Sequence, residues 1–175
     1  TVVGAFDNAL TIATGITATL DLNGHIVDRD LWSAKGSGYV FNIDNGSLTL
    51  TDSNPTATHD PAVIYKDPIT AETVIVTGGV LTGGRDSQTG GGVYMKDGTF
   101  TMKGGSIVGN CAGDTDSWGP AGCGGGVYMQ SGTFTISGGA ICGNMAVSKV
   151  LGGGKHGDGG GIYVNSGTFT LTGGE

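Results

Sequence analysis

The sequence predicts an all-β protein, a right-handed parallel β-helix (solenoid) of about five three-stranded rungs. Two observations support this prediction: glycine supplies 37 of the 175 residues, and a Gly-Gly-Gly-aliphatic-Tyr motif recurs after 34 and then 35 residues. Glycine costs roughly 1 kcal/mol per position inside a helix, which excludes a helical bundle. The glycines follow no three-residue period and only four prolines are present, which excludes collagen. Short strands joined by tight corners remain.

Three copies of one repeat define the period, and internal repeats of this length are typical of solenoids. The Gly-Gly-Gly motif occupies residues 90–95, 124–129 and 159–164. A Gly-Thr-Phe-Thr motif follows in each copy, at residues 98–101, 132–135 and 167–170. The first two copies end with Gly-Gly-x-Ile-x-Gly-Asn, at residues 104–110 and 138–144.

Each repeat therefore holds three short segments in which apolar and polar residues alternate, as in a half-buried strand. Segments this short cannot form a stable sheet within one repeat. Stacking each segment on its counterpart in the next repeat makes three parallel sheets around a coil, with rungs about 4.8 Å apart. Glycine suits the corners because sharp turns need positive φ or close approach of two backbones.

We expect one domain over residues 1–175, built in three parts. Residues 1–38 form the first rung, and residues 39–84 form the second, which an insertion at residues 52–73 interrupts. Residues 85–175 hold the regular repeats. The chain begins without Met and stops within a repeat, so we expect it to be a fragment of a longer protein.

Alternation assigns the side chains of the strands to an inner and an outer face. In the regular repeats the inner columns begin with Val93, Met95, Phe100, Met102 and Ile107. In the first rung, the pattern predicts that Leu20 stacks on Leu48, Leu22 on Leu50, Ile26 on Leu81 and Thr19 on Ser47. The outer face carries a column of tyrosines, Tyr94, Tyr128 and Tyr163, beside columns of threonine. Asn110 and Asn144 recur at one corner, where their amides can form a ladder.

These motifs resemble the glycine-rich right-handed parallel β-helix repeats of bacterial surface proteins that are described as adhesin-like or pectin-lyase-like. The resemblance rests on the Gly-Gly-Gly-Val-Tyr, Gly-Thr-Phe-Thr and Gly-Gly-Ser-Ile-Val-Gly-Asn motifs and covers nearly the whole chain. It implies a secreted or cell-surface location in a bacterium, with the signal and the anchor outside this segment. It says little about activity, because the repeats encode the scaffold.

The composition excludes two classes of partner. A net charge of −7 argues against nucleic acid, whose binding relies on clustered Lys and Arg. No run of about 20 apolar residues occurs, so we expect no membrane insertion. The partners that remain are a glycan or host surface ligand and the rest of a larger surface protein.

Loops carry function on solenoids, and four connections after the third strands should emerge at one edge. The ligand-binding residues that we predict there are Trp32, Arg85, Asp86, Asp114, Asp116, Trp118, His156 and Asp158. A sugar ring would stack on an indole such as that of Trp118 and hydrogen-bond to the neighbouring carboxylates. In the competing interpretation, both tryptophans fold back to cover the flank of the solenoid.

No catalytic residue is predicted. Hydrolysis of a polysaccharide needs two carboxylates at a fixed separation, whereas the outward strand positions carry mainly Thr, Tyr and Ser. We expect no cofactor and no metal site. Calcium would need 6–8 oxygen ligands, and the acidic pairs at residues 28–30 and 114–116 are better explained as solvated loops.

Cysteines point to an oxidising location. Cys111 and Cys123 bracket the Trp118 loop, and a disulfide between them suits an extracellular protein. Cys142 would then remain a thiol. The rival pairing joins Cys111 to Cys142 across adjacent rungs.

The function that we predict is that of a non-catalytic surface adhesin or binding module, which presents loops for a glycan or host ligand on a rigid β-helix. The runner-up is a polysaccharide lyase or glycoside hydrolase of the pectin-lyase-like class. A structural spacer or stalk is a third interpretation. A remote fourth is ice binding by the Thr-x-Thr array, against which stands the general preference of threonine for exposed strand positions.

Overall fold

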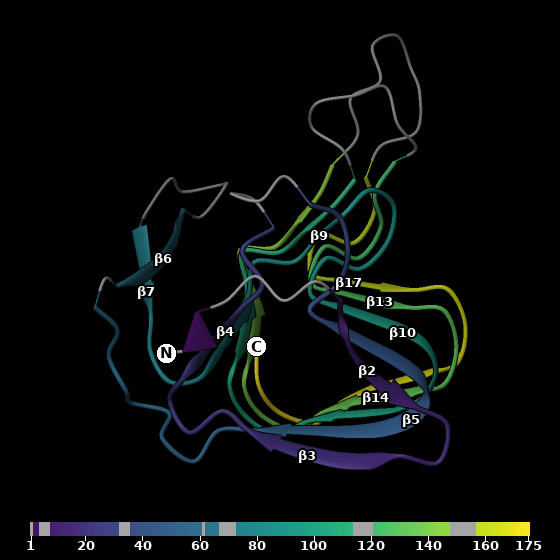
Figure 1. The fold of residues 1–175 in the computed structure, drawn as a ribbon, viewed down its shortest axis with the longest axis horizontal. Helices are drawn as coiled ribbons and strands as arrows, with labels where there is room; N and C mark the ends of the chain where they lie inside the picture. The colour runs from purple at the N-terminus through teal and green to yellow at the C-terminus, as the bar shows by residue number, and fades with distance from the viewer. Residues whose placement is uncertain are drawn as a thin grey trace, which may run out of the picture.

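The protein is an all-β, three-sided parallel β-helix, in which strands stack into three parallel sheets around a closed coil (Figure 1). The computed structural model describes residues 2–3, 8–31, 36–60, 62–66, 73–113, 121–147 and 157–175. The predicted fold class is confirmed.

The strands form five stacked levels. The first level holds β2 (Leu10–Ala13), β3 (Thr17–Asp21) and β4 (Ile26–Asp28), and the short β1 (Val2–Val3) pairs with β4. The second holds β5 (Phe41–Thr51), β8 (Val80–Thr82) and β9 (Arg85–Asp86). The third holds β10 (Val93–Met102), β11 (Ser106–Val108) and β12 (Cys111–Ala112). The fourth holds β13 (Val127–Met129), β14 (Thr133–Ile136), β15 (Ala140–Cys142) and β16 (Met145–Ala146), and the fifth holds β17 (Ile162–Val164) and β18 (Thr168–Leu171).

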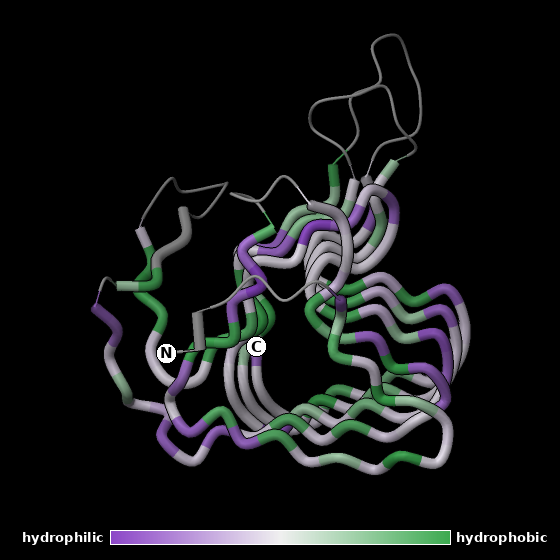
Figure 2. The backbone as a smooth tube through the Cα atoms, viewed as in Figure 1, coloured by the Kyte–Doolittle hydropathy of each residue, from purple (hydrophilic) through white to green (hydrophobic). Residues whose placement is uncertain are grey.

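The repeat motifs set the three sheets. The Gly-Gly-Ser-Ile segments build the sheet β1-β4-β8-β11-β15, and a smaller sheet follows in the order β16-β12-β9. The Gly-Gly-Gly and Gly-Thr-Phe-Thr segments share the largest sheet, because β5 and β10 run unbroken through the corner that separates β13 from β14. Hydropathy repeats from level to level along the stacked strands, as Figure 2 shows.

The core fills the coil with one side chain per inner position and level. Phe100 and Phe134 are fully buried, and their rings stack with centroids 4.8 Å apart and planes 12° apart. Val93, Met95 and Met102 are also fully buried. In the regular repeats the pairing matches the predicted columns, since Val93 pairs with Val127 and Phe100 with Phe134.

The predicted register of the first rung is wrong. Ala18, not Leu20, stacks on Leu48, and Leu20 stacks on Leu50. Val27, not Ile26, stacks on Leu81. In β3 the slip is two residues, which keeps every side chain on the same face of the strand, so alternation alone does not distinguish these two registers. In β4 the slip is one residue, so the predicted face is wrong as well: Val27 packs against the inner core, and Ile26 packs outside it with Val76 and Val80. The structure places the remaining residues of the misassigned columns as follows: Leu22 lies buried beyond β3, Thr17 stacks on Ser47, and Thr19 stacks on Thr49.

The predicted asparagine ladder is confirmed. Asn110 is fully buried, and its Nδ2 donates to Oδ1 of Asn144 at 3.0 Å. Its Oδ1 accepts the backbone N–H of Gly84 at 3.0 Å, and Nδ2 of Asn144 donates to the carbonyl of Ile107 at 2.8 Å. The amides thus satisfy backbone groups at a corner where the sheets separate, which prevents the penalty of leaving them buried and unpaired.

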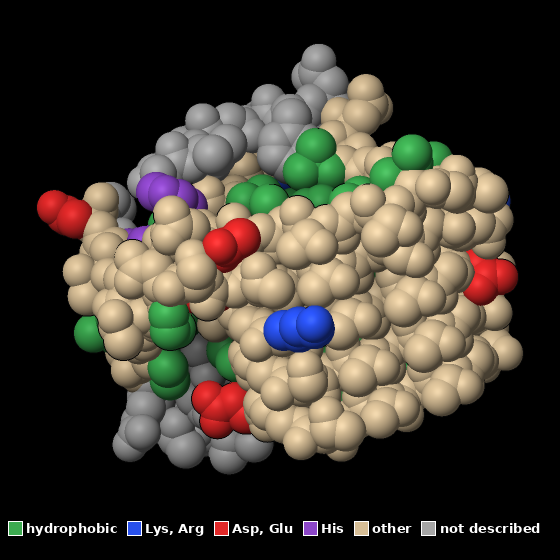
Figure 3. Space-filling model, turned by 90° about the horizontal axis from the view of Figure 1, so that it is seen from below, with side chains coloured by type: hydrophobic (Ala, Val, Ile, Leu, Met, Phe, Trp, Pro, Cys, Tyr) green, Lys and Arg blue, Asp and Glu red, His purple; other side chains and the backbone are tan. Residues whose placement is uncertain are grey.

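One outer face of the solenoid is a hydroxyl array. Two columns run through all five levels without interruption: Thr17, Ser47, Thr99, Thr133, Thr168 and Thr19, Thr49, Thr101, Thr135, Thr170. Seen from the side of β3 and β14, the surface is broad and mostly neither hydrophobic nor charged (Figure 3). The ice-binding alternative depends on this face and stays a prediction.

The insertion forms a lobe outside the coil. Its antiparallel hairpin, β6 (Val63–Lys66) and β7 (Thr73–Val76), stands beside the sheet that holds β4 (Figure 1). The Asp52 carboxylate fixes the base of the lobe, since it accepts the backbone N–H groups of Gly24 at 2.7 Å and Gly79 at 2.6 Å. Val76 and Val63 pack against Val80 on the outside of the sheet.

Candidate binding edge

Four tyrosines form a stacked ladder on the outer face of the largest sheet. Tyr39 stacks on Tyr94 with ring centroids 4.7 Å apart, Tyr94 on Tyr128 at 5.6 Å, and Tyr128 on Tyr163 at 5.3 Å. The ring planes lie within 17° of one another in each pair. All four side chains are half-buried, so ring edges and phenol ends face outward while the ring faces cover each other.

Glycine corners bring the ladder close to the neighbouring edge of the coil. Gly124 has a φ of +67°, and a Cβ there would lie 2.8 Å from the backbone of Tyr128. Gly90 and Gly159 occupy the same place below Tyr94 and Tyr163, also with positive φ. The left-handed conformation is nearly free of cost for glycine alone, which explains the invariant first glycine of the three motifs.

Asp86 lies beside the first rings of the ladder. Its Oδ1 accepts the backbone N–H groups of Gln88 at 3.0 Å and Thr89 at 2.8 Å, while Oδ2 accepts from the Ser37 hydroxyl at 3.5 Å. Its charge raises the pKa of Tyr39, although burial of that phenol contributes more. Asp86, a residue of β9, therefore places a negative charge next to the first ring of the ladder.

A buried arginine supports the same corner. Arg29 is only 4% exposed, and its Nη1 donates to the backbone carbonyl of Tyr39. Burial lowers the pKa of Arg29, and the charge of Asp86 opposes that shift. The arginine thus fixes the main chain of Tyr39, which positions the first ring.

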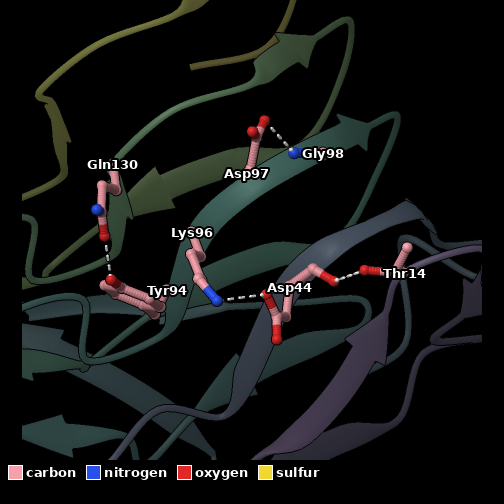
Figure 4. A network of polar contacts seen from close by, with 7 residues as sticks. All are labelled: Thr14, Asp44, Tyr94, Lys96, Asp97, Gly98 and Gln130. Atoms are coloured by element: carbon pink, nitrogen blue, oxygen red, sulfur yellow. Dashed lines mark hydrogen bonds and ion pairs between the residues drawn. The ribbon is translucent and has the colours of Figure 1, made fainter.

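The ladder carries its own polar contacts (Figure 4). Tyr94 donates its hydroxyl proton to Oε1 of Gln130, one level further along. Lys96 and Asp44 form an exposed ion pair at 3.0 Å, and such pairs stabilise little in water. We therefore treat Gln130 as part of the candidate edge and the ion pair as surface chemistry.

The structure brings together part of the predicted ligand-binding set. Arg85 and Asp86 form β9, with Arg85 bridged to Gly38. Asp158 continues the row Thr89–Cys123–Asp158, which runs along the ladder. Asp158 therefore lies two levels from Thr89, whose backbone N–H donates to Asp86. The other predicted residues lie outside the described residues: Trp32, Asp114, Asp116, Trp118 and His156.

Sequence reasoning missed Tyr39 as a member of this edge. Asn42, not Tyr39, pairs with Tyr94 in the β5–β10 register. Tyr39 reaches the ladder from three residues earlier in the chain, so it falls outside the repeat period. No periodic signal could have found it.

The disulfide remains a prediction. All three cysteines lie in described segments, and none is in a disulfide. Cys111 is fully buried in β12, with Sγ 3.7 Å from the carbonyl oxygen of Ala112. Cys123 is part-exposed beside Thr89.

The described part of the chain shows no cluster of three His, Cys, Asp or Glu side chains that could hold a metal ion. Nor does it contain a helix with the length and apolar character that crossing a membrane takes. The described carboxylates of the edge, Asp86 and Asp158, belong to different columns of the stack, because Asp86 stacks on Ala112 and Asp158 stacks in the column of Thr89.

Three tyrosines of the ladder, Tyr39, Tyr94 and Tyr128, should titrate late. Burial raises the pKa of Tyr39, Tyr94 and Tyr128 above the ordinary value of 10.0. Their neutral phenols therefore contribute stability below about pH 10, and this contribution is lost as the pH rises from the unfolded towards the folded pKa. We expect the phenolate absorbance of the folded chain to rise at higher pH than that of the unfolded chain.

The control for this titration is the same chain in guanidinium chloride, where the five tyrosines should titrate together near pH 10. Coincident curves for folded and unfolded protein would contradict the half-buried ladder.

No protein-family model, curated protein or solved structure matches this chain. The fold is thus established from the strand pairing itself, and no family is identified.

Proposed function

We propose that this chain is a non-catalytic binding module of a secreted or cell-surface bacterial protein, which holds a glycan or host-surface ligand along the tyrosine edge. The tyrosine edge comprises the ladder (Tyr39, Tyr94, Tyr128 and Tyr163) with Asp86, Gln130 and Asp158. The observation that supports the proposal best is the ladder, a straight row of part-exposed phenols beside two carboxylates.

Such a row has the properties of a preorganised binding surface. Tyrosine offers a large contact area with few rotatable bonds and a polar end, and it is enriched at interfaces. Because each ring stacks on the next, little side-chain entropy remains to be lost on binding. A sugar or peptide would contact ring edges and hydroxyl groups here, since the ring faces are already covered.

The contacts of Asp86 favour binding over catalysis. Asp86 is bonded to two backbone N–H groups, which suits a carboxylate that shapes a loop. A lyase or hydrolase therefore remains the runner-up, and a spacer the third candidate.

The decisive experiment applies fluorescently labelled protein to a glycan array. We expect Tyr128→Ala to lose at least about tenfold in affinity, because a central aromatic anchor commonly supplies 1.4 kcal/mol or more. Tyr128→Phe should retain most binding if the ring dominates. Thr135→Ala, from the same level but on the threonine face, should bind like the parent protein.

Each competing function has its own signature. Release of reducing ends or unsaturated products from any bound polysaccharide would establish the enzyme instead. Equal affinities of Tyr128→Ala and Thr135→Ala would move the site away from the ladder. An array without any bound glycan, together with no product, would favour the spacer.

A further inference from the structure

A second candidate site lies on the opposite side of the coil, between the inserted lobe and the sheet that contains β11 and β15. Two adjoining cavities of about 570 Å³ and 380 Å³ form one groove there. They share Thr77, Ser106, Ala140 and Glu175. Each volume falls within the range of known ligand pockets.

One wall of the groove is the edge of a strand. Residues Val74 to Thr77 line it consecutively. Because alternate side chains of a strand point to opposite faces, an unbroken run of lining residues means that the main chain itself faces the groove. β7 pairs with β6, and no other described strand pairs with it. Its second edge is therefore unpaired within the described part of the chain.

The floor is built from small residues. Ser106 and Ala140 point outward from β11 and β15, next to the core residues Ile107 and Ile141. Gly104, Gly105 and Gly139 form the adjoining corners. A second main chain can approach such a floor closely, since few side-chain atoms stand in the way.

The floor also holds a buried hydroxyl without a partner. Ser106 is 9% exposed and lines both cavities. Its backbone N–H donates to Gly79, but the described residues supply no hydrogen bond to its Oγ. A buried hydroxyl in that state is destabilising unless water or a ligand satisfies it.

Apolar contact is available at the rim of the groove. Ile75 is 65% exposed on the four-residue strand β7, and the N–H and C=O groups of an unpaired strand edge can pair with another chain. The carboxylate of Asp52 already accepts three backbone N–H groups. Asp52 therefore contributes to the shape of the groove more than to its charge. The groove therefore offers main-chain pairing, one hydroxyl and an apolar contact.

We propose that this groove receives an extended peptide segment of a partner protein, which adds to the open edge of β7 as a third strand. The main chain of the peptide supplies the pairing, as in other cases of β-strand addition. Ser106 hydrogen-bonds to a backbone group of the peptide, and Ile75 contacts one of its apolar side chains. This site is separate from the tyrosine edge and does not depend on the function proposed for it.

The test selects binders from a phage-displayed library of random linear peptides and measures one synthetic binder by fluorescence anisotropy. Ala140→Leu fills the groove and should weaken that peptide at least about tenfold. Ser106→Ala removes only the hydroxyl and should weaken it about fivefold, the loss of one hydrogen bond. Thr135→Leu places the same side chain on the threonine face at the same level and should leave the affinity unchanged.

Hydrogen exchange then locates the peptide. The amides of residues 73–76 should exchange more slowly when the peptide is bound. The proposal fails if no peptide is enriched, if Ala140→Leu binds normally, or if protection appears only elsewhere. It also fails if a polysaccharide, and no peptide, protects β7. Self-association that Ala140→Leu abolishes would identify a second copy of this chain as the occupant, which also overturns the proposal.

Discussion

Phe134→Ala should lower the free energy of unfolding by about 3–5 kcal/mol, the range for removal of a fully buried phenylalanine. Phe134 is 0% exposed and lies between Phe100, on which it stacks with ring centroids 4.8 Å apart, and the tilted ring of Phe169, whose centroid is 5.4 Å away. The interior of this coil is one side chain thick per level. The cavity would therefore interrupt a continuous aromatic column, and the levels on both sides would lose packing.

The chain contains a matched control at the same position of the repeat. Phe169 is 38% exposed, so Phe169→Ala removes the same atoms but loses less burial, about 1–2 kcal/mol in proportion to the area. Urea unfolding followed by circular dichroism would measure both variants. Equal losses would show that Phe134 does not occupy the interior. A lower m-value in Phe134→Ala alone would indicate that the levels unfold separately, as nearest-neighbour coupling in solenoids allows.

The register of the regular repeats could be predicted because two successive pairs of motif copies each define it. Identical residues recur at a fixed period, so Val93 can stack only on Val127 if the motifs align. The first rung lacks this information. Its Thr-Ala-Thr-Leu-Asp strand fits β5 equally well in alternation after a slip of two residues, and packing selected the register with Ala18 on Leu48.

The candidate sites, like the rungs, could be predicted from the sequence only in part. The repeat revealed three rings of the ladder, whereas Tyr39 joins from a different register, positioned by the buried Arg29. The groove depends on the insertion, whose path over the sheet follows from tertiary contacts such as Asp52 with Gly24 and Gly79. These pairs are far apart in sequence and carry no periodic signal. Sequence alone could locate the insertion but not the cavity beneath it.

The glycine corners lead to the second large effect, which we expect for Gly126→Ala. Neither Gly126 nor Gly161, the same motif position one level later, has positive φ, so alanine suits the backbone of both. Their surroundings differ. A Cβ on Gly126 would lie 2.6 Å from the carbonyl oxygen of Gly161 and 2.8 Å from Nδ2 of Asn144, whereas the nearest atom to a Cβ on Gly161 would be 3.8 Å away.

Gly126→Ala should therefore destabilise the fold by about 3 kcal/mol or more, the upper range for overpacking, because the clash also displaces the amide that Asn144 gives to Ile107. Gly161→Ala should stabilise it by about 0.4–1 kcal/mol, since alanine restricts the unfolded chain. Urea unfolding of the pair isolates the stacking contact, because both variants gain one methyl group at one motif position. Two stabilised variants would mean that the levels are not stacked at this corner as closely as described, and the ladder of asparagine amides would then lose its basis too.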